Sequence, residues 1–233
     1  MTTHTIVSRS KWIEARKKLL AKEKEFTRLR DQLSAERREL PWEKVEKEYI
    51  FDGVEGKQSL SDLFNGKSQL MIYHFMLGPQ WEEGCPSCSF WADNFNGIDI
   101  HLAHRDISLL SVSRADIQKI EAYKKRMGWN FKWVSSFNND FNYDYGVSFT
   151  PKEKESNEIT YNYLNQPYFI DELAGVSVFV KNEQGDIYHT YSTYSRGLDI
   201  LNGAYNYIDL SPKGRDEGDG IMNWLRRHDQ YDL

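Results

Sequence analysis

Cysteine is scarce in this sequence, because only Cys85 and Cys88 occur among its 233 residues. A disulfide framework of the kind that stabilises small secreted domains is therefore excluded. Long hydrophobic runs are also missing, since no stretch approaches the roughly 18 apolar residues of a membrane helix. The first residues reach charged side chains without an apolar segment, so no secretory signal is visible. We expect a cytoplasmic protein that does not enter a membrane.

An excess of basic charge is absent as well. Lysine and arginine number 30 against 35 aspartate and glutamate, and the net charge is -5. Nucleic-acid binding requires a basic surface that replaces the counterions of the phosphates, so we expect no nucleic-acid partner. The chain has 233 residues, of which 39% are hydrophobic. These suffice to bury a large core without help from disulfides or metals.

Residues 8–40 predict one long helix, within an N-terminal helical extension that we place at residues 1–45. Ser8 or Ser10 can cap its start, and Pro41 ends it. The apolar residues recur at steps of three and four, with Lys, Arg and Glu on the other faces. This apolar stripe needs a surface to cover it, which is either the following domain or a second copy of the helix in a homodimer. Its members are Trp12, Ile13, Leu19, Leu20, Phe26, Leu29, Leu33 and Leu40.

Residues 46–233 alternate between strand and helix patterns. A near-continuous apolar run at 68–75 predicts a buried central strand, and 107–112 predicts a second one. A hairpin at 176–191 and a final helix at 198–208 follow. The stretch around 137–170 is polar and rich in aromatic residues, which indicates an insertion. The pattern predicts an α/β domain with a central mixed sheet flanked by helices.

The two cysteines stand in a Cys-Pro-Ser-Cys turn between the 68–75 strand and a helix. Free backbone N–H groups at the start of a helix stabilise a thiolate, the form of cysteine that attacks disulfides. Pro86 takes the first helical position, where its missing N–H has no consequence. We predict that Cys85 is the nucleophile and that Cys88 resolves the mixed disulfide. This thiol–disulfide oxidoreductase chemistry needs no cofactor, and its thiol or disulfide substrate stays open.

Further residues are candidates to support this chemistry. Ser87 and Pro86 lie inside the turn itself. His74 ends the central strand and is a candidate proton carrier for Cys88, although a histidine satisfied within the core is the commoner case. Trp81 either walls the site or packs as an ordinary loop aromatic. The C-terminal segment is expected either to dock as a cap or to bind an anion or a partner. The residues concerned are Trp224, Arg226, Arg227 and His228.

The Cys-Pro-Ser-Cys turn, placed after a buried strand and at the start of a helix, resembles the thioredoxin-like superfamily. The order of the later elements agrees, and short strands at 49–51 and 131–134 resemble additions found in peroxiredoxin-type members. Over nearly its whole length the chain resembles the uncharacterised bacterial domain-of-unknown-function family 899. That resemblance rests on the charged N-terminal helix, on residues 84–91 and on residues 224–229. It implies a thioredoxin-like fold with an N-terminal helical extension and an aromatic-rich insertion.

The sequence departs from both of these better-known groups. Thioredoxins place a cis-proline just before the hairpin, whereas residues 173–177 contain no proline. This difference argues against docking of substrates in the manner of thioredoxins. Peroxiredoxins hold peroxide with a Pro-x-x-x-Thr/Ser-x-x-Cys motif, but here Gly78 stands in the proline position and Glu82 in the hydroxyl position. A peroxidase is therefore disfavoured.

Two alternatives stay open at this point. A Cys85-x2-Cys88-x12-His101-x2-His104 spacing nearly matches a zinc site. The histidines are one residue too close, however, and a chain with a large core has no need of a structural metal, so we expect none. The second alternative is a non-catalytic thioredoxin-fold protein with unreactive cysteines. Such a protein would oligomerise or bind partners through the N-terminal helix and the aromatic insertion.

Overall fold

The structure of the protein is a computed structural model that describes residues 4–156, 159–167, 170–218 and 220–232. The chain divides into two compact units, Met1–Pro41 and Trp42–Leu233. Each unit is described by itself below.

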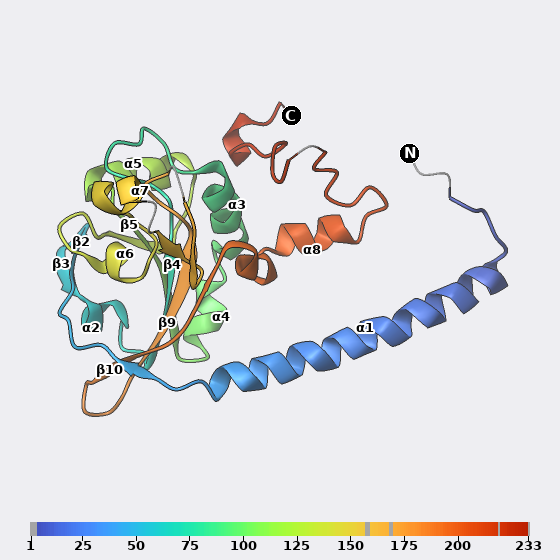
Figure 1. Cartoon of the computed structure of the whole chain (residues 1–233), viewed down its shortest axis with the longest axis horizontal. Helices are drawn as coiled ribbons and strands as arrows, with labels where there is room; N and C mark the ends of the chain where they lie inside the picture. Colours follow the sequence, from blue (N-terminus) through green and yellow to red (C-terminus); the bar gives the residue numbers. More distant parts are fainter. Residues whose placement is uncertain (1–3, 157–158, 168–169, 219, 233) are drawn as a thin grey trace. The chain divides into compact units, whose positions relative to one another are not determined.

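The first unit consists of helix α1 (Arg9–Arg38) (Figure 1). Ser8 is its N-cap, and the Ser8 Oγ accepts a hydrogen bond of 3.5 Å from the backbone N–H of Lys11. No side chain of α1 is buried, and its unit offers no second layer that could cover the apolar stripe. Part of that stripe follows a strict seven-residue repeat, which is typical of helices that supercoil around one another. The repeating positions are Trp12, Leu19, Phe26 and Leu33.

The second unit is built on a mixed sheet in which the described strands follow the order β1-β10-β9-β4-β5-β6-β2-β3. Strands β4, β5 and β6 run parallel to one another, and the remaining neighbours are antiparallel. The strands are β1 (Glu43–Lys44), β2 (Ile50–Gly53), β3 (Gly56–Ser59), β4 (Gln69–His74), β5 (Ile107–Ser113), β6 (Lys132–Ser135), β9 (Gly175–Lys181) and β10 (Ile187–Tyr194).

Helices cover both faces of this sheet, with α2 and α6 on one side of the strands and α3 on the other (Figure 1). Residues of α5, η1 and α8 pack on the same face of the sheet as α3. The helical segments are α2 (Leu60–Leu63), α3 (Pro86–Phe95), α4 (Asp99–Ala103), α5 (Ile117–Arg126), α6 (Phe141–Asp144), α7 (Pro151–Ser156), α8 (Gly203–Asp209) and the 3-10 helices η1 (Ser195–Leu201) and η2 (His228–Gln230).

The central strand β4 has a neighbour on each side, β5 and β9, and it separates two apolar cores. Because successive side chains of a strand point to opposite faces, its residues divide between these cores. Leu70 and Ile72 enter the core under α2 and α6. Tyr73 enters the core under α3 and α5, together with Cys88. The position of a residue along β4 therefore decides which core it joins.

The predicted α/β fold with a central mixed sheet flanked by helices is confirmed, and so is the N-terminal helix. The helix after the cysteines ends at Phe95, two residues before Gly97, whose φ of +90° is one that side-chain-bearing residues rarely adopt. One helix prediction needs correction. The predicted last helix is interrupted at Asn202, whose extended backbone ends η1 and whose side chain caps α8.

The stretch around 137–170 is less irregular than its composition indicates. It contains α6, α7 and a small hairpin of β7 (Thr160–Tyr161) and β8 (Leu164–Asn165). Positions 157–158 and 168–169 lie outside the described residues.

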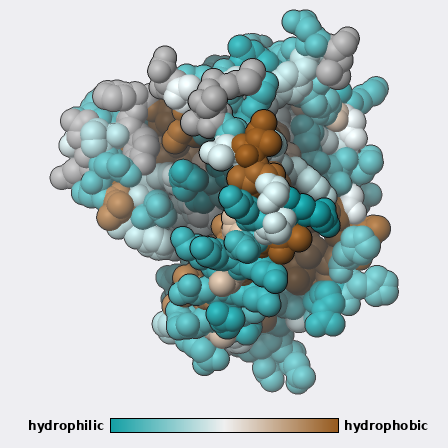
Figure 2. Space-filling model, turned by 90° about the vertical axis from the view of Figure 1, so that its right-hand side faces the viewer, coloured by the Kyte–Doolittle hydropathy of each residue, from teal (hydrophilic) through white to brown (hydrophobic). Residues whose placement is uncertain are grey.

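Across the described ranges, no helix combines the length and the hydrophobicity required to cross a membrane. Viewed from one side, the surface is mostly hydrophilic, with hydrophobic residues in small groups between the polar ones (Figure 2).

Candidate functional site

The cysteine turn begins where the chain leaves β4 and crosses the end of the sheet. The backbone N–H of Cys85 donates to the carbonyl oxygen of Met76 at 3.0 Å, which ties the turn to the end of β4. Cys85 has non-helical backbone angles (φ -55°, ψ 132°) and occupies the N-cap position of α3, and Pro86 follows at the first helical position. The predicted placement of both residues at the start of the helix is therefore found in the structure.

Gly84 brings the turn unusually close to the aromatic core. A Cβ atom at this position would lie 2.5 Å from Cε1 of Tyr123 and 2.7 Å from Cε1 of Phe75. Both distances are far below van der Waals contact, so no side chain fits there. The close approach presses the chain before Cys85 against the rings that cover β4.

Cys85 carries the more acidic of the two thiols. It is partly exposed, and its pKa falls to about 6. The main cause is a hydrogen bond from the Cys88 thiol, and the backbone N–H groups of Cys88 and Ser87 and the Ser87 side chain act in the same direction. Desolvation opposes these effects without cancelling them. At neutral pH Cys85 is therefore mostly thiolate, the nucleophilic form.

Cys88 has the opposite character. It is only 1% exposed, and burial raises the pKa of its thiol well above the ordinary value, as does the neighbouring Cys85. Its Sγ accepts a hydrogen bond of 3.4 Å from the backbone N–H of Met76. The hydroxyl of Tyr73 also bonds to this sulfur and favours its thiolate. The pair thus combines one accessible thiolate with one buried thiol that keeps its proton, and both cysteines are free.

His74 lies within the core, which is the commoner of the two cases considered from the sequence. It is fully buried on the opposite face of β4 from Cys88, where its ring stacks on Phe141 and Tyr145. Its Nε2 bonds to the hydroxyl of Ser177 at 2.9 Å, and burial lowers its pKa to about 3. A neutral imidazole across the sheet cannot carry protons for Cys88, so of the two alternatives the core histidine fits the structure.

Trp81 is partly buried against the α3-side core, and its ring lies over Gly78. It lines a cavity of about 280 Å³ with Arg114 and Tyr143, away from the cavity that touches Cys88. The structure therefore places Trp81 as a packing residue of the loop and not as a wall beside the sulfurs.

His101 and His104 lie on and just after α4, beyond the break at Gly97, and both are exposed. Within the described part of the chain, no three His, Cys, Asp or Glu side chains are grouped so as to hold a metal ion.

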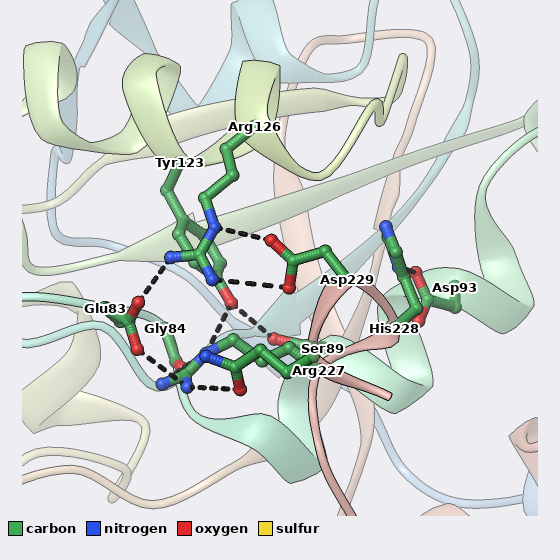
Figure 3. Close-up of polar contacts among 10 residues, drawn as sticks. Glu83, Gly84, Ser89, Asp93, Tyr123, Arg126, Arg227, His228 and Asp229 are labelled. Carbon is green, nitrogen blue, oxygen red and sulfur yellow. Dashed lines mark hydrogen bonds and ion pairs between the residues drawn. The ribbon is translucent and has the colours of Figure 1, made fainter. Parts of the chain in front are cut away.

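The C-terminal segment docks on the cysteine turn (Figure 3). Arg227 donates through Nε at 3.0 Å and through Nη2 at 2.7 Å to the carbonyl oxygen of Gly84, the residue before Cys85. Its Nη1 lies 2.7 Å from a carboxylate oxygen of Glu83, which also pairs with Arg126. The guanidinium of Arg227 therefore holds two successive residues of the loop that leads to Cys85.

A chain of hydroxyl groups continues from this arginine to the turn itself (Figure 3). The Nε of Arg227 donates to the Tyr123 hydroxyl at 3.1 Å, and that hydroxyl lies 2.8 Å from the Oγ of Ser89. Ser89 in turn donates to the carbonyl oxygen of Cys85 at 2.9 Å. Carbonyl groups on both sides of the Gly84–Cys85 bond are thus held by side chains.

A cavity of about 240 Å³ lies beside the turn, between α3 and the elements that follow β10. Ser87 and Cys88 form its edge on the turn, and Ala174, which directly precedes β9, lies on another side. The apolar and aromatic residues of the remaining wall are Tyr73, Met76, Trp91, Leu198, Tyr205, Ile221 and Met222. Its polar and charged residues are Ser195, Arg196, Asp199 and Arg215.

Two features of the site were missed from the sequence. Tyr73 contacts Cys88, and the alternation of side chains along β4 could have shown that Tyr73, and not His74, shares a face with Phe75 and the turn. Arg227 was recognised only as part of a docked segment. Nothing in the sequence pairs Arg227 with the backbone of Gly84, because that contact depends on how the chain returns.

The fold and the cysteine turn define an α/β protein with a mixed central sheet and a Cys-x-x-Cys pair at the start of a helix. Residues 1–231 match the family described as "Bacterial protein of unknown function (DUF899)", and the chain belongs to that family. No curated protein matches the sequence.

Solved structures with a similar course of the chain include several peroxiredoxins. Peroxidoxin BcpB from Mycobacterium tuberculosis is 12% identical with a TM-score of 0.48, over 72% of this chain and 97% of that one. A mutant of peroxiredoxin Q from Xanthomonas campestris is 13% identical with a TM-score of 0.46, over 68% of this chain and 90% of that one. A mutant of PrxQ from Xylella fastidiosa is 14% identical with a TM-score of 0.43, over 68% and 89%. At these identities the likeness says nothing about activity.

Proposed function

We propose that this protein is a thiol–disulfide oxidoreductase in which Cys85 attacks and Cys88 resolves. The observation that carries the proposal is the difference in exposure and in pKa between the two thiols. Cys85 is partly exposed, with its pKa lowered to about 6, whereas Cys88 is buried with its pKa raised. Such a difference is what a nucleophile and a resolving thiol require.

The reaction balances with the two electrons of the pair. The Cys85 thiolate attacks one sulfur of a disulfide, forms a mixed disulfide and releases the first thiolate. Cys88 then gives up its proton and attacks the Cys85 sulfur, which releases the second thiol and leaves a Cys85–Cys88 disulfide. Tyr73 supports the second step, because its hydroxyl favours the thiolate of Cys88. The same steps in reverse oxidise a substrate dithiol.

Alkylation of the native protein tests the proposal. We expect Cys85 to react with iodoacetamide along a titration curve with a midpoint near pH 6. At pH 7 its thiolate fraction should be roughly 30-fold that of a free cysteine with a pKa near 8.5. Mass spectrometry after proteolysis assigns the label, with Cys88 unlabelled until the protein is unfolded.

The variants Cys85→Ser and Cys88→Ser complete the experiment. The first should neither label nor reduce a disulfide, and the second should stop at a stable mixed disulfide. A Cys85 midpoint near that of free cysteine, with no Cys85–Cys88 bond under mild oxidant, would leave the non-catalytic interaction protein as the better hypothesis.

We also propose that α1 pairs with α1 of a second copy, on the separate observation of its exposed seven-residue repeat. Trp12, Leu19, Phe26 and Leu33 form one line on the helix. In a parallel pair Lys18 faces the partner's Glu23 across that line, which adds charge complementarity.

The variant Phe26→Glu in the full chain tests the pairing, with Lys24→Glu as the control on another face of α1. We expect light scattering to give twice the chain mass for the native protein and for the control, and the single mass for Phe26→Glu, since a buried charge at the seam is unfavourable. A native protein of single mass contradicts the pairing.

A further inference from the structure

The cavity beside the cysteine turn bears on the kind of disulfide that the site accepts. Its edge is formed by Ser87, whose side chain bonds to Cys85, and by Cys88. A group lodged in the cavity therefore contacts Cys88 and Ser87 directly, and Ser87 links it to Cys85. The cavity measures about 240 Å³, which suits one ring-sized group and not a protein segment.

Backbone groups around the turn are already occupied, which disfavours a peptide substrate. Extended peptides bind by adding hydrogen bonds to free backbone edges. Here the carbonyl of Ala174 accepts from the Tyr161 hydroxyl at 2.7 Å, and the N–H of Leu173 donates to Val147 at 2.8 Å. The N–H and carbonyl of Met76 are bonded to Cys88 and Cys85. A peptide would have to displace these bonds before it could pair.

The lining of the cavity indicates the chemistry of its occupant. Met76, Trp91 and Leu198 supply apolar and aromatic surface. The charged side chains on its wall are two guanidinium groups, from Arg196 and Arg215, against the single carboxylate of Asp199. Asp199 bonds to both arginines, and Asp209 makes two further bonds with Arg215, so these charges balance one another. The apolar and aromatic surface therefore sets the preference of the cavity, and an apolar ring matches it.

We propose that the cavity binds one half of a low-molecular-weight disulfide, an apolar ring-sized thiol, and presents its sulfur to Cys85. This inference rests on the proposed function. The bound half stays attached as the mixed disulfide on Cys85 while the other half leaves as thiolate. Attack by Cys88 on the Cys85 sulfur then frees the bound half as thiol, with the Cys88 proton passing to it. The dithiol of the protein supplies both electrons.

The variant Ala174→Leu tests the cavity, because its larger side chain occupies part of the space. The control is Ala103→Leu on α4, the same change outside the cavity. Rates of a single turnover are measured with two disulfides, dithiobis(nitrobenzoate), which is aromatic and acidic, and hydroxyethyl disulfide, which is small and neutral. We expect Ala174→Leu to slow the aromatic disulfide about tenfold, the effect of losing roughly two buried methylene groups.

With Ala174→Leu, the reaction rates of hydroxyethyl disulfide and of iodoacetamide should stay within a factor of about two of the native rates. With Ala103→Leu, the rates of all three reagents should stay within the same factor. Equal slowing of both disulfides, or no slowing of either, overturns the cavity as a binding site.

A second measurement on the native protein covers the case in which Ala174→Leu does not fold. Nitrobenzoate, which has the ring and the acid but no sulfur, should slow the aromatic disulfide competitively and leave iodoacetamide unaffected. Absence of inhibition at saturating nitrobenzoate contradicts the inference.

The failure of the cavity and the failure of the proposed function give different results. If Cys85 reduces neither disulfide, the oxidoreductase proposal is wrong. If Cys85 reduces both disulfides and neither Ala174→Leu nor nitrobenzoate changes the rates, the oxidoreductase proposal stands. Only the proposal that the cavity binds the disulfide is then wrong.

Discussion

The two faces of strand β4 differ in chemistry although they belong to the same six residues. On the α3 side, Tyr73 touches the buried sulfur of Cys88. On the α2 side, its neighbour His74 is locked between aromatic rings and a serine. One face is therefore coupled to the thiols and the other only to stability. Substitutions one position apart should separate these two properties.

The largest effect is expected for His74→Gln, on the stability side of the comparison. Burial lowers the pKa of His74 to about 3, so below pH 6.5 the unfolded chain binds a proton that the folded chain refuses. Stability therefore falls as the pH drops through this window, by about 2 kcal/mol between pH 6.5 and pH 5. Glutamine does not titrate and can still bond to Ser177. Urea unfolding at several pH values should show a shallower decline for the variant.

Glu172 also titrates in this range, because burial raises its pKa to about 7. Since Glu172 is present in both the native protein and His74→Gln, its contribution to the pH dependence of stability cancels in the difference between them. The reactivity of Cys85 toward iodoacetamide should be the same in both. The proposed separation of the two faces is contradicted if the free energy of unfolding falls equally with pH in both proteins. It is also contradicted if the reactivity of Cys85 toward iodoacetamide changes in the variant.

A smaller effect is expected for Tyr73→Phe, on the thiol side. The lost hydroxyl no longer favours the Cys88 thiolate, so resolution of the mixed disulfide should slow about fivefold, the equivalent of roughly 1 kcal/mol. Acid quenching and mass spectrometry follow the mixed disulfide with time. Tyr123→Phe is the matched control, since that hydroxyl bonds to Ser89 and Arg227 and not to a cysteine. Resolution at the native rate in Tyr73→Phe would contradict the assignment.

Much of the framework was predictable from the sequence, because it depends on local patterns. The apolar run at 68–75 predicts a buried central strand, and Pro86 directly after Cys85 predicts the start of a helix. Both signals lie within a few residues of the structure they produce. The placement of Cys85 and Cys88 around the start of that helix could be predicted for the same reason.

The surroundings of the cysteines were less predictable, because they are assembled from distant parts of the chain. His74 stayed a candidate beside the thiols because of its closeness in sequence, whereas the pleat of β4 turns it to the other core. Arg227 reaches Gly84 across 143 positions, and no local pattern encodes that contact. The cavity likewise joins residues from α3, η1 and the segment after α8.

The absence of a side chain at Gly84 has a consequence for redesign of the protein. Any substitution there would push Phe75 and Tyr123 aside, so the position of the thiolate and the packing of the aromatic core cannot be altered independently at this residue. Ser87 offers a different route, since it contacts Cys85 from the edge of a cavity that has space. Redox tuning that spares the fold should therefore begin inside the Cys-Pro-Ser-Cys turn and leave the residue ahead of it untouched.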